Sequence, residues 1–419
     1  MRLKDLNIAI ILWTFLFMQV AATLTFLATR AEKFISFNGY LQLVKYSTIF
    51  LLILSIFALF VKSKSFWKFE ILKYSFALQI LILYFTMLIH TDIKAINSPT
   101  ILLMFLTILI IFSSNINLKI LNLVSITISF LNITLVFLQI LKFIPVAQDN
   151  VRIGLNIISD RPTGLLFNAF AMGYASVITF AISAYFLKLN KFPLLNTLSI
   201  IFSITSIFLS ATRTPLVLVV IIGLITILQN NQVAKKYWKL VTFAVPGMLI
   251  FFPLATVLVG NLTGNQDMAT LNGRTFLWDC VTSRWNQFIP FGVGVQGAFP
   301  QGFCSDDEWF SKLRHPENMF LLNYVESGIL GVVGLLILFV VTFWYSGKAL
   351  KMGSFLPMAV TSTFFMSSIF YVPLFHYLPF LENRTADRGI YNFFLFTFLW
   401  MVIMNASKSE NIKPLSKKL

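Results

Sequence analysis

Long apolar runs recur along the whole chain, and they constrain its fold more than any other feature. Of the 419 residues, 58% are hydrophobic and 11% are charged, whereas soluble domains carry about 25% charged residues. A helix of about 20 apolar residues is long enough to cross the hydrocarbon core of a bilayer. We expect about twelve such spans, at residues 8–27, 41–61, 71–89, 99–112, 118–141, 163–187, 194–210, 215–228, 240–259, 320–345, 355–375 and 389–405. The predicted fold is an all-α, polytopic membrane helix bundle.

The lysines predict how these helices are oriented. They recur on alternate short loops and in a basic tail at 406–419, which is the positive-inside pattern of a protein with both termini cytoplasmic. This topology divides the formal net charge of +16 into +15 on the inner side and +1 on the outer side. The basic excess is therefore a topology signal that faces anionic lipid, and no nucleic-acid partner is expected. We also expect an uncleaved first helix, because its apolar run exceeds that of a signal peptide.

Two segments on the expected outer side, 142–162 and 260–319, are longer than a simple turn. They divide the chain into nine spans within 1–259, a large outer loop at 260–319 and three spans within 320–405. The large loop contains Trp278, Trp285 and Trp309 and is too apolar for disorder. We expect it to form an ordered, partly helical cap, with an amphipathic or interfacial helix at residues 275–285.

The two cysteines of the chain, Cys280 and Cys304, both lie in this outer loop. An oxidising outer compartment allows a disulfide between them. A sequence does not set the distance between two thiols, so a Cys280–Cys304 bridge and two separate thiols both remain open.

Nine of the ten arginines are expected on the outer side, whereas most lysines are expected on the inner side. The planar guanidinium of arginine binds phosphate or carboxylate in a forked geometry, so the separation indicates an anionic ligand outside. Arg161 precedes Pro162 at an expected helix N-terminus, where free N–H groups favour an anion. Arg213 occupies a tight turn between two spans, and Arg274 follows Gly273 in the outer loop. The alternatives are a helix cap at Arg161, a snorkelling side chain at Arg213 and ordinary turn chemistry at Gly273.

A histidine, a carboxylate and an amide precede the tenth expected span, as His315, Glu317 and Asn318, next to Arg314. They are the best acid–base candidates in the chain, and the alternative is a purely structural interfacial histidine. The sequence contains no cluster with metal-ligand spacing, no phosphate-binding loop of the Walker type and no dinucleotide fingerprint. We therefore expect neither a metal nor a cofactor.

Taken in this order, the motifs resemble the bacterial O-antigen polymerase and O-antigen ligase family of integral-membrane glycosyltransferases. The shared features are about twelve spans, a large late outer loop, an outer arginine before a middle helix and a Ser/Thr-Arg turn between spans. A Gly-Arg-x-x-x-Trp motif ending at Trp278 and a His/Asn motif before Gly328-x-x-Gly331 complete the pattern. The resemblance implies a GT-C-like fold in the bacterial inner membrane. It also implies metal-independent, inverting transfer of an undecaprenyl-diphosphate-linked glycan to a sugar hydroxyl at the periplasmic face.

The resemblance also implies roles for individual residues. Arg213 and Arg274, with Arg161 as a third, would hold the diphosphate and stabilise its negative charge as it leaves. Ligases of the family carry His directly before Asn, whereas here Glu317 fills that position and His315 stands two residues earlier. This departure favours the polymerase branch, with Glu317 or His315 as the base. The supporting residues are Asn318, Trp278 and Arg314. The expected partners are undecaprenyl-diphosphate-linked oligosaccharides, membrane lipid and, as a further candidate, a chain-length regulator protein.

Three alternatives remain. An O-antigen ligase would transfer the glycan to lipid A–core and has the same family pattern. A transporter or flippase for lipid-linked sugars would fit twelve helices, but transporters place ionisable residues near the bilayer midplane and show repeated halves. A non-catalytic scaffold for a polysaccharide assembly complex would leave the separation of arginine from lysine unexplained.

Overall fold

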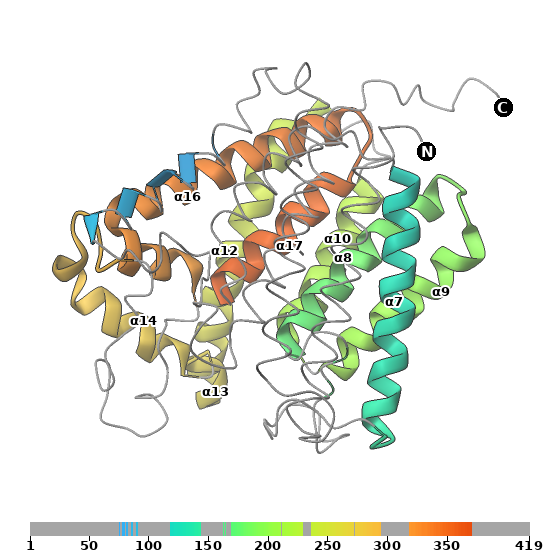
Figure 1. The fold of residues 1–419 in the computed structure, drawn as a ribbon, viewed down its shortest axis with the longest axis horizontal. Coiled ribbons are helices and arrows are strands. Elements are labelled where there is room, and N and C mark those ends of the chain that lie inside the picture. Colours follow the sequence, from blue (N-terminus) through green and yellow to red (C-terminus); the bar gives the residue numbers. More distant parts are fainter. Residues whose placement is uncertain are drawn as a thin grey trace, which may run out of the picture.

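The computed structural model describes residues 118–143, 169–210, 212–228, 236–271, 273–294 and 318–370, with Pro162, Gly164 and scattered positions between 75 and 90. Within these residues every regular element is a helix (Figure 1). The elements are α7 (Leu118–Ile140), α8 (Ala169–Lys188), α9 (Pro193–Leu209), α10 (Arg213–Leu228), α12 (Trp238–Thr263), α13 (Gln266–Ala269), α14 (Arg274–Ser283), the 3-10 helix η2 (Trp285–Phe288), α16 (Met319–Lys351) and α17 (Leu356–Phe370).

Seven of the expected spans correspond to long helices of the structure, namely α7, α8, α9, α10, α12, α16 and α17. Of these, α12 and α16 are long and apolar enough to cross a bilayer on their own. The described positions of the third expected span, between 75 and 89, are also helical. The other four spans lie outside the described residues, so the total of about twelve remains a prediction.

Helix α8 is the centre of the described bundle. It packs against α7, α9, α10 and α17, and α16 packs in turn against α17 and α12. The apolar core includes fully buried side chains of α8, α9 and α10, such as Ile182, Ile207 and Leu218. Helix α12, in contrast, exposes large apolar side chains along its length, including Phe243 at 65% and Leu262 at 77%. In a membrane protein such a face contacts lipid.

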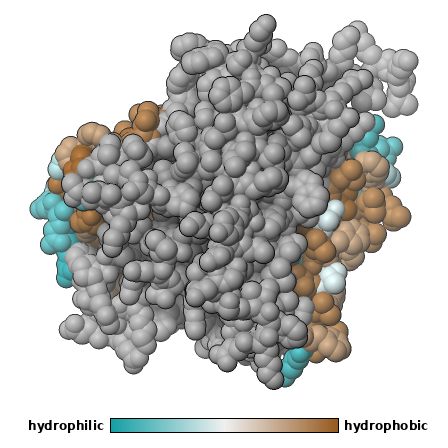
Figure 2. All heavy atoms as spheres, viewed as in Figure 1, coloured by the Kyte–Doolittle hydropathy of each residue, from teal (hydrophilic) through white to brown (hydrophobic). Residues whose placement is uncertain are grey.

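Apolar side chains also cover the surface of the molecule on the side formed by α7 and α9. Phe137 of α7 and Phe208 of α9 are among them, each about half exposed. Figure 2 shows this apolar band in brown, with hydrophilic residues at its two ends. A band of this kind, bounded by polar ends, is the pattern expected where helices cross a bilayer.

Three helix boundaries differ from the sequence-based expectation. The helix expected from residue 163 is described from Ala169, and Gly164 has a left-handed φ of 54° that no α-helix accommodates. Helix α12 continues past the expected end of the ninth span at residue 259 as far as Thr263. The tenth span is α16, which is interrupted by non-helical backbone at Gly328.

Candidate functional site

Arg213 stands at the tight turn that joins α9 to α10. The Ser210 hydroxyl donates to the Ile207 carbonyl at 2.7 Å and lies 2.6 Å from the Thr212 hydroxyl, which closes the turn. Gly173 of α8 packs against this turn so closely that an added Cβ would lie 3.2 Å from the Ser210 hydroxyl. The side chain of Arg213 is exposed, and within the described part of the chain its guanidinium makes no hydrogen bond or ion pair. It is therefore accessible to an anionic ligand.

Arg274 is the first residue of α14 and is 7% exposed. Gly273, with a φ of 83°, turns the chain into this helix, and Leu271 before it also has a positive φ of 50°. The guanidinium donates from Nη1 to the Leu271 carbonyl at 3.3 Å. The Thr275 hydroxyl donates to the Thr270 carbonyl, also at 3.3 Å. The turn therefore holds a buried cation in a defined orientation at a helix N-terminus.

Tyr174 of α8 connects the two arginine-bearing turns. Its buried hydroxyl lies beside the Thr214 side chain and within electrostatic range of Arg274, although it makes no hydrogen bond of good geometry. Thr214 directly follows Arg213, so the turn that carries Arg213 and the turn that carries Arg274 both lie near Tyr174. Sequence analysis missed Tyr174, and the available signal was a phenol in an otherwise apolar span.

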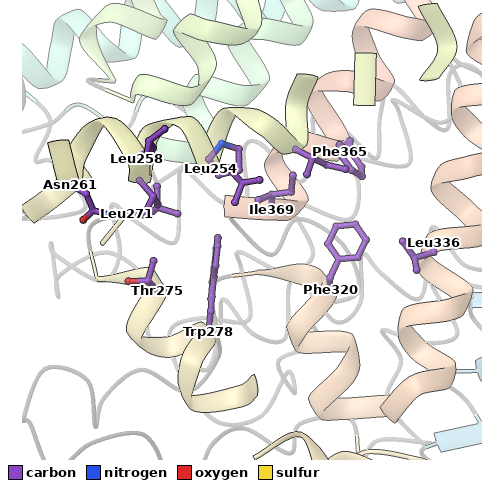
Figure 3. Close-up of a pocket in the computed structure, with 13 residues that line it drawn as sticks. Leu254, Leu258, Asn261, Leu271, Thr275, Trp278, Phe320, Leu336, Phe365 and Ile369 are labelled. Carbon is purple, nitrogen blue, oxygen red and sulfur yellow. The ribbon is translucent and has the colours of Figure 1, made fainter. Parts of the chain in front are cut away.

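An apolar cavity of about 690 Å³ lies between α12, α16 and α17 and is covered by α14. Trp278 and Phe320 point into it, facing Leu254, Leu258 and Ile369 (Figure 3). Its polar lining residues, Asn261 and Thr275, lie together at one end, and Thr275 is adjacent to Arg274 in the chain. The cavity can therefore hold an apolar chain whose charged head lies near Arg274.

The cap segment that follows η2 binds the kinked part of α16. At Gly328 the backbone has a φ of 63° and a ψ of −153°, so the helical hydrogen-bond pattern is interrupted there. The Val325 and Glu326 carbonyls instead accept from the N–H groups of Val293, at 2.8 Å, and Gly294, at 3.1 Å. The segment at Val293 and Gly294 is thereby attached to the kinked part of α16.

Asn318, expected to support catalysis, is the N-cap of α16. Its Oδ1 accepts from the backbone N–H groups of Phe320 at 2.9 Å and Leu321 at 3.1 Å. Trp278 of α14 and Phe320 of α16 line the same cavity, so the start of α16 lies close to the arginine-bearing turns. Helix α14 spans Arg274–Ser283, which confirms the cap helix expected at residues 275–285 to within two residues.

The remaining predicted site residues fall outside the described part of the chain: Arg161, Arg314, His315, Glu317 and Cys304. Cys280 is disulfide-bonded, whereas its pairing with Cys304 remains a prediction. Among the described residues, no group of three or more His, Cys, Asp or Glu side chains could hold a metal ion. The described site therefore consists of two arginine-bearing turns, a linking tyrosine and an apolar cavity.

Residues 198–336 match a protein-family model described as O-Antigen ligase. This segment runs from α9 into α16 and includes Arg213, Arg274, Trp278, Asn318 and Gly328. A comparison with curated proteins found no match to the chain. The family match and the apolar helices together indicate a membrane protein. The match over residues 198–336 supports the O-antigen ligase and polymerase family that the motifs predicted, and it does not separate the two branches.

Proposed function

We propose that the protein is an O-antigen polymerase, or a polymerase of a related surface polysaccharide, in the bacterial inner membrane. It would transfer an undecaprenyl-diphosphate-linked glycan onto a sugar hydroxyl of a lipid-linked repeat unit at the periplasmic face. The observation that carries the proposal is the meeting of two arginine-bearing turns, at Arg213 and Arg274, beside an apolar cavity. A lipid diphosphate has this combination of a doubly charged head and a long apolar chain.

The two arginines differ in a way that suits this ligand. Arg274 is buried and held by its own turn, so it provides a fixed donor set. Arg213 is exposed at the first turn of α10, so its guanidinium is free to move toward a ligand. Preorganised cations of this kind stabilise the charge that develops on a leaving diphosphate without reorganising.

The cavity beneath α14 supports the lipid part of the proposal. Its lining is almost entirely apolar, and α12, which forms one wall, exposes Leu254 and Leu258 to the expected lipid phase. A polyprenyl chain entering from the bilayer would pack against Trp278 and Phe320. Its diphosphate would then lie at the end of the cavity where Thr275 follows Arg274.

The proposed reaction breaks the bond between the anomeric carbon and the diphosphate oxygen, and the diphosphate leaves with the bonding electrons. The acceptor hydroxyl oxygen bonds to the anomeric carbon from the opposite face and loses its proton to Glu317 or His315. Glu317 immediately precedes Asn318, the N-cap of α16. The presence of Glu317 where ligases of the family carry histidine favours the polymerase.

Complementation distinguishes the polymerase from the ligase. The gene would be expressed in polymerase-null and in ligase-null bacteria, and the lipopolysaccharide would be resolved on a gel. Restored ladders in the first strain alone support the proposal, whereas restored capping of lipid A–core in the second strain would establish the ligase instead. If both strains remain uncorrected and export of lipid-linked units is restored in a flippase-null strain, the protein is a transporter instead.

The site assignment is tested separately with Arg213→Ala, Arg274→Ala and Glu317→Gln. Each should abolish the ladder while the protein remains in the membrane. Lys236→Ala is the matched control, because Lys236 is an exposed cation at the start of α12, on the expected inner side. Full activity in all three site variants would show that the site is elsewhere.

A further inference from the structure

Buried polar side chains line the facing sides of α7, α8 and α9. They recur at intervals of three, four or seven residues, so on each helix they occupy one face. The members are Asn122, Ser125 and Ser129 of α7, Thr179 and Ser183 of α8, and Asn196, Ser199 and Ser203 of α9, each at most 5% exposed. We call this set the polar seam.

The middle of the polar seam is closed by direct hydrogen bonds. Ser129 Oγ donates to the Ser199 carbonyl at 3.1 Å, and the hydroxyls of Thr179 and Ser203 lie 2.7 Å apart. Ser183 Oγ donates to Ser199 Oγ at 2.9 Å. Polar groups that satisfy one another in this way hold membrane helices together and leave no room for a ligand.

One end of the polar seam is different. Asn122 is fully buried, and neither its Nδ2 nor its Oδ1 has a hydrogen-bond partner. The Oγ of Ser125 and the Oδ1 of Asn196 are likewise buried without a partner, although Asn196 Nδ2 donates to the Lys191 carbonyl at 2.6 Å. Buried amides and hydroxyls in proteins are almost always hydrogen-bonded, to protein or to ordered water.

Helix register places these atoms at one level. The Gly164 N–H, just before α8, donates to Gln139 near the end of α7, and α8 runs antiparallel to α9. Helices α7 and α9 therefore run in the same direction. Asn122 precedes Ser129 by seven residues, and Asn196 precedes Ser203 by seven, so both lie about 10 Å along their helices from the level at which Ser129 and Ser203 meet. The α8–α9 turn closes this end of the bundle (Figure 1).

We propose that ordered water is bound at this end of the polar seam, bridging Asn122, Ser125 and Asn196. The four unpaired atoms comprise amide and hydroxyl oxygens together with the Asn122 amide nitrogen, so the ligand must both accept and donate. Water does both, and a buried water needs two to four such partners. A cation would leave the Asn122 N–H₂ unsatisfied. The bound water joins α7 to α9 at the end of the bundle opposite Arg213.

The test is the sign of a change in thermal stability in detergent. Asn122→Leu and Ser125→Ala each remove a partner of the water, so each should lower Tm by about 2–4 °C. The combined variant should lower Tm by less than the two single changes together, because both act on one water site. Thr127→Ala, an exposed position on α7, is the matched control and should leave Tm nearly unchanged.

Without bound water the same substitutions would remove buried groups that have no partner, so both single variants would melt at or above the wild-type temperature. That result would overturn the proposal. A Tm that depends on whether Na⁺, K⁺ or choline is the salt cation would overturn it in favour of a bound metal cation. A high-resolution cryo-electron microscopy map should show density within hydrogen-bond distance of Asn122 and Asn196, and a clear map without it would also contradict the proposal.

Discussion

Replacing Gly328 with alanine should detach the cap segment at Val293 and Gly294 from α16. The backbone at Gly328 lies in a region that is essentially limited to glycine, and forcing another residue into it costs about 1–3 kcal/mol. An added Cβ would also lie 2.7 Å from the Phe288 carbonyl oxygen and closer still to the Pro290 carbonyl. If the kink straightens instead, the two backbone hydrogen bonds from Val293 and Gly294 are lost, each contributing about 0.5–1.5 kcal/mol.

A loss of about 2 kcal/mol would raise the undocked fraction of the cap by about 30-fold. The assay is the rate of limited proteolysis in the cap segment of the detergent-purified protein, with Tm measured in parallel. Gly223→Ala is the matched control, because that glycine lies inside helix α10 and no heavy atom lies within 4 Å of an added Cβ. The control should leave Tm unchanged or raise it. Equal cleavage rates in Gly328→Ala and Gly223→Ala would refute the account of the kink.

Substitutions at three positions test the site. Arg274→Lys should lower the transfer rate by about 100-fold, because lysine keeps the charge but loses the forked donor set; wild-type rates in a reconstituted assay would show that charge alone suffices. Tyr174→Phe should raise KM for the lipid-linked donor more than it lowers kcat, because the phenol lies between the two arginine-bearing turns; an unchanged KM would remove that linking role. Asn318→Ala should destabilise the protein by about 1 kcal/mol. Asn318→Asp should restore the wild-type stability, because aspartate also caps a helix. If Asn318→Asp is inactive at wild-type stability, the amide has a role beyond capping.

The helices were the most predictable part of the structure. Helix α7 ends within one residue of the expected span, and α9 and α10 agree to within two. Length and apolarity suffice for this, because a helix is the only way for a single chain segment to satisfy its backbone in lipid. The kink at Gly328 was not predicted, because there the Val325 and Glu326 carbonyls accept hydrogen bonds from Val293 and Gly294, which lie 32 residues earlier in the chain.

The candidate site was chosen by residue type, and its arrangement came only from the structure. Arg213 and Arg274 were candidates because a cation between apolar spans has few structural explanations, and their role remains a prediction. Their connection through Tyr174 was not visible, because it depends on how α8 packs against α10 and the cap. Gly292 and Gly294 illustrate the same limit. They permit close approach to the α16 backbone and to His90, which are distant in the sequence.

The most direct test of the central claim is transfer by the purified protein in lipid nanodiscs, supplied only with undecaprenyl-diphosphate-linked repeat units and a chelator. The account predicts elongated lipid-linked products from the wild-type protein and none from Arg213→Ala or Arg274→Ala. Elongation that persists in both variants, or a wild-type protein that binds the lipid-linked units without elongating them, would contradict it.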